Sequence, residues 1–180
     1  MKKFKKNNGI LFWITGLSGS GKTNLARKIL PFINKKYGAT IHLDGDTLRG
    51  ILELYGYTFK ERISNSKKFV SLAKLFTDQG VNVVFSIVGL MNKPRAWNRK
   101  HIEKYIEIFI KSDVQKIISK GKKKKIYKNK KNIVGVNIKP QFPKNPDITI
   151  YNTFNKHLTF YELELQNKIK NIIIKKKYDY

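Results

Sequence analysis

The sequence predicts an α/β fold in which a parallel β-sheet is covered by helices on both faces. Apolar, β-branched runs alternate with stretches of helical spacing along most of the 180 residues, and this alternation is typical of parallel sheets built from strand–helix–strand units. The pattern G-x-x-x-x-G-K-[ST] lies between one such strand and one such helix. Since parallel sheets of this kind bind ligands at the carboxyl ends of their strands, the polar residues there are the candidate site.

The first unit is a strand, a glycine-rich loop and a helix. The apolar run Ile10–Ile14 predicts a buried strand, and Asn24 to Phe32 predicts a helix. The segment between them is typical of phosphate-binding loops, in which backbone N–H groups surround the phosphate oxygens at a helix N-terminus. Lys22 would reach the β- and γ-phosphates of ATP, and the Thr23 hydroxyl would hold Mg²⁺. The predicted ATP site is Gly16, Leu17, Ser18, Gly19, Ser20, Gly21, Lys22, Thr23 and Asn24.

The rest of the chain continues the alternation. Gly80 is expected to cap one helix, and Thr159-Phe160-Tyr161-Glu162 predicts a capping box at the start of the last, with Leu158 and Leu163 as its hydrophobic staple. The lysine-rich stretch 120–131 is expected to be an exposed, mobile loop. The expected strands are 40–43, 81–88, 105–110 and 148–150, and the expected helices are 48–54, 60–79, 94–104, 112–119 and 159–178.

The charge of the chain is extreme, with a formal net charge of +26. The excess of lysine has three explanations: binding of nucleic acid, attraction of small anionic substrates, or a composition bias that leaves inert surface charge.

The chain has no cysteine, which excludes disulfides and zinc–thiolate sites. No apolar run reaches the roughly 20 residues of a membrane helix, and cleavage of a leader would destroy the phosphate loop, so we expect a cytoplasmic protein without a membrane partner.

A second group of polar residues, Asp44-Gly45-Asp46, follows the second expected strand. Two carboxylates at this position can divide two tasks, the support of Mg²⁺ and the acceptance of a proton from an attacking hydroxyl. The alternative is an ordinary Asp-Gly turn with a helix N-cap. Arg49 would lie one helical turn further and could bind an anion. The sheet rule also brings Ser86, at the end of the next strand, to the same rim.

Several blocks of this sequence resemble the adenylyl-sulfate kinase family. Leu43-Asp44-Gly45-Asp46-x-x-Arg49 and Gly56-Tyr57-Thr58-x-x-Glu61-Arg62-x-x-Asn65 match its most specific motifs, and 132–137 and 143–147 are similar to the segment that follows its lid. The similarity runs from about Ile10 to Tyr151. It implies a single P-loop kinase domain over residues 1–180, a three-layer sandwich with a basic lid at about 116–139 and a C-terminal helix at about 159–178.

The resemblance implies transfer of the γ-phosphoryl group of ATP to the ribose 3′-hydroxyl of an activated nucleotide. Lys22 and Asp46 would be catalytic, with Asp46 against the accepting hydroxyl, and Thr23 and Asp44 would support Mg²⁺. Arg49, Arg62 and Asn65 would hold the anionic end of the acceptor, and Tyr57 could stack on its base. Ser86 and Ile133 complete the implied acceptor site, and a homodimer is an allowed assembly.

The departures from the family lie where the acceptor would bind. Ile87-Val88-Gly89-Leu90-Met91-Asn92 replaces the usual Phe-Ile-Ser-Pro-Tyr-Arg, and Ile133 replaces a base-stacking Phe. The segments 97–99 and 134–136 are similar to a branch found in surface-polysaccharide gene contexts, one member of which phosphorylates cytidine diphosphoramidate. Adenylyl sulfate is therefore the first expected acceptor and cytidine diphosphoramidate the alternative. A nucleic-acid-binding NTPase is an alternative of another class, favoured by charge alone, and nucleic acid is not an expected partner.

Overall fold

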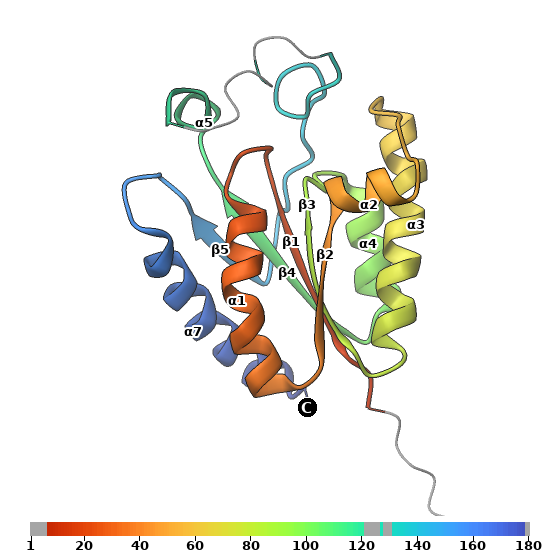
Figure 1. The fold of residues 1–180 in the computed structure, drawn as a ribbon, viewed down its shortest axis with the longest axis vertical. Coiled ribbons are helices and arrows are strands. Elements are labelled where there is room, and N and C mark those ends of the chain that lie inside the picture. The colour runs from red at the N-terminus through yellow and green to blue at the C-terminus, as the bar shows by residue number, and fades with distance from the viewer. Residues whose placement is uncertain (1–6, 121–126, 128–130, 179–180) are drawn as a thin grey trace, which may run out of the picture.

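The structure is a computed structural model that describes residues 7–120, 127 and 131–178. Five strands form one parallel sheet in the order β2-β3-β1-β4-β5 (Figure 1). The predicted α/β fold is confirmed. The strands are β1 (Ile10–Gly16), β2 (Thr40–Asp44), β3 (Asn82–Ile87), β4 (Lys104–Lys111) and β5 (Ile148–Tyr151). The helices are α1 (Lys22–Tyr37), α2 (Gly45–Ile51), α3 (Phe59–Thr77), α4 (Asn92–His101), α5 (Val114–Lys120) and α7 (Leu158–Lys176).

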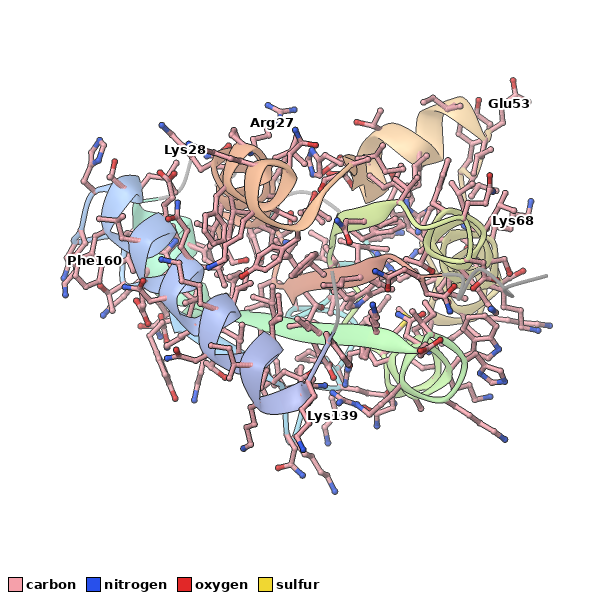
Figure 2. All side chains as sticks on the ribbon, turned by 90° about the horizontal axis from the view of Figure 1, so that it is seen from below. Arg27, Lys28, Glu53, Lys68, Lys139 and Phe160 are labelled. Atoms are coloured by element: carbon pink, nitrogen blue, oxygen red, sulfur yellow. The ribbon has the colours of Figure 1, made fainter. Side chains whose placement is uncertain are left out.

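Helices cover both faces of the sheet, α1 and α7 on one face and α3 and α4 on the other (Figures 1 and 2). Alternate residues of β1, β3 and β4 supply the two cores, because successive side chains point to opposite faces. In β1, Phe12 and Ile14 pack toward α1 and α7, whereas Leu11 and Trp13 pack toward α3. A third apolar cluster, which includes Leu17 and Tyr127, lies beyond the carboxyl end of the sheet.

Several helix boundaries differ from the expected ones. α1 continues through Pro31 to Tyr37 because Ile33 and Tyr37 are buried against the sheet. α2 begins at Gly45, where Asp44 caps it, and not at residue 48. α4 ends at His101, since Ile102 turns into the core as extended chain and β4 follows directly.

The predicted cap of the last helix is wrong. The last helix begins at Leu158, one residue before Thr159, because Leu158 packs on the core below α7. The cap is therefore His157, whose ring nitrogen accepts from the Thr159 N–H, and the expected capping box is not formed. A capping box is formed instead by Thr58 and Glu61, at the start of α3. The predicted terminating glycine of α3 is confirmed. Gly80, with a φ of 83°, donates to the Thr77 carbonyl, and the next N–H, that of Val81, donates to the Phe76 carbonyl, as in helices that end in a left-handed glycine.

The expected lid falls partly outside the described residues, because the structure does not describe 121–126 and 128–130. The mobility expected of the lysine-rich stretch therefore remains a prediction. Tyr127, expected in an exposed loop, is buried, since its ring joins the apolar cluster around Leu17 and Ile133. None of the helices in the described part of the chain combines the length and apolar character needed to cross a membrane.

Candidate active site

The phosphate loop connects β1 to α1 at the carboxyl edge of the sheet. Gly21 caps α1 with a φ of 94°, a backbone conformation that residues other than glycine rarely adopt. The next residue, Lys22, is buried, and its ammonium group donates to the Leu17 carbonyl at 2.7 Å. The loop thus holds a buried cation beside the N-terminus of a 16-residue helix. Both features favour a bound phosphate.

Asp44 is the centre of the hydrogen bonds in the site. Its Oδ2 accepts from the hydroxyls of Thr23 at 2.9 Å and Ser86 at 2.7 Å, and its Oδ1 accepts from the backbone N–H groups of Asp46 and Thr47 at 3.1 Å each. Burial by itself would raise the pKa of Asp44, but these hydrogen bonds outweigh it and lower the pKa below its ordinary value. Asp44 is therefore an ionised anchor that connects β2, β3, α1 and α2.

His42 extends this group along β2. Its Nε2 lies 2.9 Å from the Ser86 hydroxyl, and both side chains are on the face of the sheet that α1 covers. Burial lowers the pKa of His42, and the charge of Arg27 lowers it further, whereas Asp44 opposes the shift. The ring is therefore neutral at physiological pH.

Across the cavity from the phosphate loop, two arginines share one aromatic ring. The guanidinium groups of Arg49 and Arg62 lie 4.7 and 5.2 Å from the centre of the Tyr57 ring. Arg49 donates to the Leu54 and Gly56 carbonyls, which fixes the loop that carries Tyr57. Burial and the charge of Arg49 both lower the pKa of Arg62. Two neighbouring cations in a cavity wall form a site suited to a phosphate or sulfate group.

The segment 131–134, part of the expected lid, lines a further side of the cavity. Arg62 donates to the Asn132 carbonyl at 3.0 Å, which joins α3 to the segment containing Ile133. The Tyr127 hydroxyl donates to the Ser18 carbonyl at 2.6 Å, and burial raises the pKa of Tyr127 to about 12. Gly135, with a φ of 97°, packs against Leu17 so closely that an added Cβ would lie 2.7 Å from its methyl group. Tyr127 and Gly135 thus rest on the phosphate loop.

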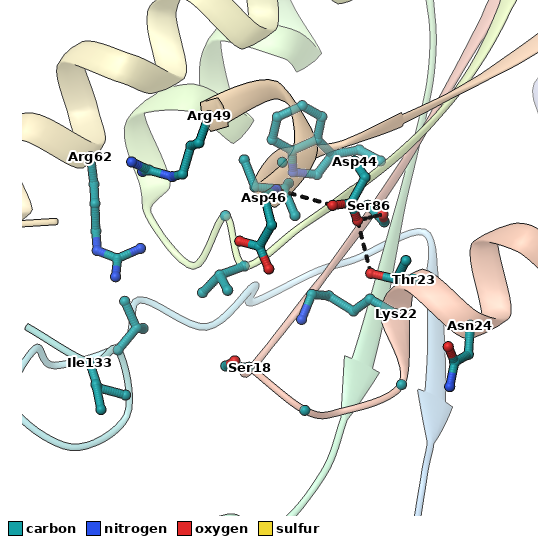
Figure 3. Close-up of a pocket in the computed structure, with 18 of the residues that line it drawn as sticks. Ser18, Lys22, Thr23, Asn24, Asp44, Asp46, Arg49, Arg62, Ser86 and Ile133 are labelled. Carbon is teal, nitrogen blue, oxygen red and sulfur yellow. Dashed lines mark hydrogen bonds between the residues drawn. The ribbon is translucent and has the colours of Figure 1, made fainter. Parts of the chain in front are cut away.

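A cavity of about 810 Å³ joins these parts. Lys22 and Asp46 lie on facing sides of it, with Arg49, Arg62 and Ile133 further along (Figure 3). Most of the expected site residues line it, namely Ser18, Gly19, Gly21, Lys22, Thr23, Asn24, Asp44, Asp46, Arg49, Tyr57, Arg62, Ser86 and Ile133. Four do not line it, namely Gly16, Leu17, Ser20 and Asn65. The side chain of Asn24 points away from the space between Lys22 and Asp46 (Figure 3).

The cavity also has walls that the sequence reasoning missed. Asn152, Phe154 and Lys156 follow β5 and line it beside the phosphate loop, and the Asn152 amide donates to the Ser20 carbonyl at 3.0 Å. The rule that ligands bind beyond strand ends could have indicated them. Trp13, Ser66 and Phe69 line the opposite wall, where no local motif marks them.

A divalent cation suits the donors present. In the described part of the chain no three His, Asp or Glu side chains gather in a way that could cage a metal. Mg²⁺ needs no such cage, since it is usually bound by one or two carboxylates or hydroxyls together with substrate phosphates and water. Thr23, Asp44 and Asp46 are oxygen donors of that kind beside the phosphate loop.

Comparison with known proteins identifies the family. The sequence model of the adenylylsulphate kinase family matches residues 8–151. The chain belongs to the adenylylsulphate kinase family. It is 36% identical over 157 residues to the cytidine diphosphoramidate kinase of Campylobacter jejuni, a match that covers 85% of this chain and 92% of that protein. It is 31% identical to the adenylyl-sulfate kinase of Clostridium kluyveri, over 92% of this chain and 89% of that protein.

Solved structures give the same result. The APS kinase CysC of Mycobacterium tuberculosis, in complex with AMPPNP and APS, superposes with a TM-score of 0.81 at 25% identity, over 91% of this chain and 99% of that chain. The expected fold, family and reaction class are confirmed: the chain is a P-loop kinase, a phosphotransferase of a family that uses ATP and phosphorylates nucleotides.

Proposed function

We propose that this kinase transfers the γ-phosphoryl group of ATP to a ribose hydroxyl of an activated nucleotide through the cavity between the phosphate loop and Tyr57. The observation that carries the proposal is the pairing of two anion sites in one cavity. Lys22 and the α1 N-terminus form one, and Arg49 with Arg62 form the other. A donor and an acceptor nucleotide each present anionic groups to such sites.

Asp46 is the residue proposed to orient the accepting hydroxyl. Its carboxylate faces the space in front of Lys22 (Figure 3), where a γ-phosphate held by the loop would meet an acceptor held by the arginines. A carboxylate there accepts a hydrogen bond from the attacking hydroxyl and can take its proton. Bound Mg²⁺, held by the Thr23 hydroxyl with the support of Asp44, would neutralise charge on the phosphates.

Two acceptors are candidates, and cytidine diphosphoramidate has the stronger support of the two. The curated relative of that name is 36% identical to this chain, compared with 31% for the adenylyl-sulfate kinase of Clostridium kluyveri. In the cavity, the aliphatic Ile133 occupies the position where the family resemblance implies a stacking Phe. Loss of a stacked face weakens base binding by roughly 1–3 kcal/mol, and a purine loses more contact area than a pyrimidine. Adenylyl sulfate, the acceptor that the sequence motifs put first, is the second candidate.

The remaining expectations belong to this proposal. The chain forms a single kinase domain, and the enzyme works in the cytoplasm, where ATP is made. It can form a homodimer, which light scattering would detect. Nucleic acid is not proposed as a partner, because the cationic cavity is sized for small nucleotides.

A substrate panel tests the proposal. The enzyme is incubated with ATP, Mg²⁺ and one acceptor at a time: adenylyl sulfate, cytidine diphosphoramidate or a nucleoside monophosphate, and the products are identified by mass. We expect one added phosphoryl group on the cytidine compound, with a kcat/KM more than about tenfold above that for adenylyl sulfate, or about 1.4 kcal/mol of discrimination. The matched control is Asp46→Asn, which should bind ATP and fail to transfer. A preference for adenylyl sulfate would reverse the order of the two candidate acceptors. Absence of transfer to any of the nucleotides would refute the proposed function.

A further inference from the structure

The hydroxyl of Ser86 connects His42 to Asp44, and its hydrogen bonds have a fixed direction. A serine hydroxyl has one hydrogen, and that hydrogen is directed to Asp44 Oδ2 over 2.7 Å, since an ionised carboxylate can only accept. The contact of 2.9 Å between Ser86 Oγ and His42 Nε2 therefore needs a proton on the histidine. His42 donates to Ser86, and Ser86 donates to Asp44.

Asp44 accepts five hydrogen bonds. The Thr23 and Ser86 hydroxyls donate to Oδ2, and the N–H groups of Asp46 and Thr47 donate to Oδ1 together with the Thr47 hydroxyl at 3.4 Å. One of the hydroxyls is that of Thr23, so the Thr23 hydrogen points to Asp44 and its lone pairs remain for other partners. The orientation of Thr23 depends on Asp44, and Asp44 is held on one side by Ser86.

The backbone explains why these groups meet. Asp44 and Ser86 are directly paired on β2 and β3, and His42 lies two residues before Asp44 on the same face. His42 is therefore the diagonal neighbour of Ser86, within reach of a long side chain. α1 covers this face, and its first turn carries Thr23. The chain of hydrogen bonds thus runs from the middle of β2 to the start of α1.

We propose that His42 and Ser86 are positioning residues for phosphoryl transfer, which hold Asp44 so that the Thr23 hydroxyl presents its oxygen to the Mg²⁺ of the nucleotide. His42 does not line the cavity, so it acts only through Ser86. The proposal rests on the kinase function proposed above, but it does not depend on the identity of the acceptor. Successive hydrogen bonds that end on an ionised group strengthen one another. Loss of the His42 donor therefore weakens the hydrogen bond from Ser86 to Asp44.

Nucleotide binding tests this without any transfer reaction. The affinity for ADP is measured by calorimetry with and without Mg²⁺, for the parent and for His42→Phe, which keeps a ring and removes the donor. Without Mg²⁺ the two proteins should bind ADP equally, which also shows that the variant is folded. The gain in affinity on adding Mg²⁺ should be smaller in His42→Phe by about three- to tenfold, the size of one weakened hydrogen bond to a charged group.

Four further proteins make the test specific. His42→Gln keeps an N–H at the end of the side chain and should restore the gain to within about twofold of the parent. His101→Phe changes an exposed histidine on α4 and should have no effect. The double variant His42→Phe with Ser86→Ala should equal Ser86→Ala alone, because both changes act through one bond.

The ¹⁵N NMR signals of the His42 ring give an independent result, with Nε2 expected to carry the proton. An unprotonated Nε2, additive effects in the double variant, or an unchanged Mg²⁺ gain in His42→Phe would each overturn the proposal. Because ADP binding needs no acceptor, these outcomes differ from a failure of the kinase function, which the substrate panel reports.

Discussion

At the scale of single residues, Lys22 has the clearest expected effect. Its ammonium group is the buried cation of the phosphate loop, and it is positioned to follow the phosphate charge during transfer. Lys22→Ala should lower kcat by a factor on the order of 10³ or more, since such a clamp acts mainly on the transition state. The control is Lys28→Ala, an exposed lysine on the same helix (Figure 2). Steady-state turnover near the parent value in Lys22→Ala would contradict the catalytic role.

A second residue-scale prediction concerns Asp44 and pH. Its hydrogen bonds keep its pKa in the folded protein below the ordinary value, so the unfolded chain binds the proton more tightly. The anchor therefore contributes stability above the unfolded pKa of about 3.9, and this is lost as the pH falls through the folded pKa. Without Mg²⁺, Asp44→Asn should be less stable than the parent near neutral pH, and the difference should shrink below about pH 4.

Urea unfolding of both proteins from neutral to acid pH measures this difference. A difference in the free energy of unfolding that stays constant with pH would show that the ionised carboxylate has no special role.

Residues of the phosphate loop could be predicted from the sequence because a contiguous pattern fixes both their backbone and their neighbours. The roles of His42 and Tyr127 could not. Their partners, Ser86 and Ser18, are 44 and 109 residues away in the chain. Only the pairing of β2 with β3, and the packing of Tyr127 in one apolar cluster with Leu17, bring them into contact.

At the scale of elements, the buried carboxylate of Glu107 joins α4 to the sheet. It pairs with Arg95 at 2.8 Å, where the two side chains are only 5% and 6% exposed, and with Arg99 at 2.7 Å. Arg95 also donates to the carbonyl of Gly89, which lines the cavity, and to the carbonyl of Gln141. Removal of one partner of a buried pair leaves an uncompensated charge, which costs about 3–5 kcal/mol.

Glu107→Gln should therefore lower the free energy of unfolding by roughly that amount, about 3–5 kcal/mol, in urea titrations. The matched control is Asp78→Asn, which breaks the pair with Lys74 where the side chains are 43% and 37% exposed. Exposed pairs contribute about 0–1 kcal/mol. Similar losses of unfolding free energy in the two variants would mean that the ion pairs of Glu107 with Arg95 and Arg99 stabilise the fold no more than a surface pair does.

Element types were predictable where the hydrophobic period was unbroken, as in β3 and β4, but element ends were not. The sequence pattern of a capping box occurs at both 58–61 and 159–162. Only the first is used, because α7 must begin early enough to place Leu158 on the core. Helix ends thus depend on which side chains the sheet buries, which is a property of the tertiary structure and not of the local sequence.

At the scale of the whole molecule, the net charge of +26 has three explanations: binding of nucleic acid, attraction of anionic substrates, or composition bias. They predict different effects of salt and DNA on the kinetics. Exposed cations such as Arg27, Lys28, Lys68 and Lys139 project from several sides of the fold (Figure 2). A field of this sign raises the local concentration of anionic nucleotides near a cationic cavity and increases their association rate by about 10–10³-fold at low salt. The effect on a small substrate should therefore depend on ionic strength.

We expect kcat/KM for the acceptor nucleotide to fall by about tenfold or more between roughly 0.01 M and 1 M ionic strength, where the Debye length shrinks from about 30 Å to about 3 Å. kcat should change much less, because the groups around Lys22 are buried and weakly screened. Steady-state kinetics across a salt series measure kcat/KM and kcat. A comparison of sodium chloride with potassium acetate excludes effects that are specific to one ion. Duplex DNA added at low salt should inhibit by competition and not stimulate ATP turnover. A flat kcat/KM would assign the lysines to composition alone, and stimulation by DNA would instead support a nucleic-acid-dependent NTPase.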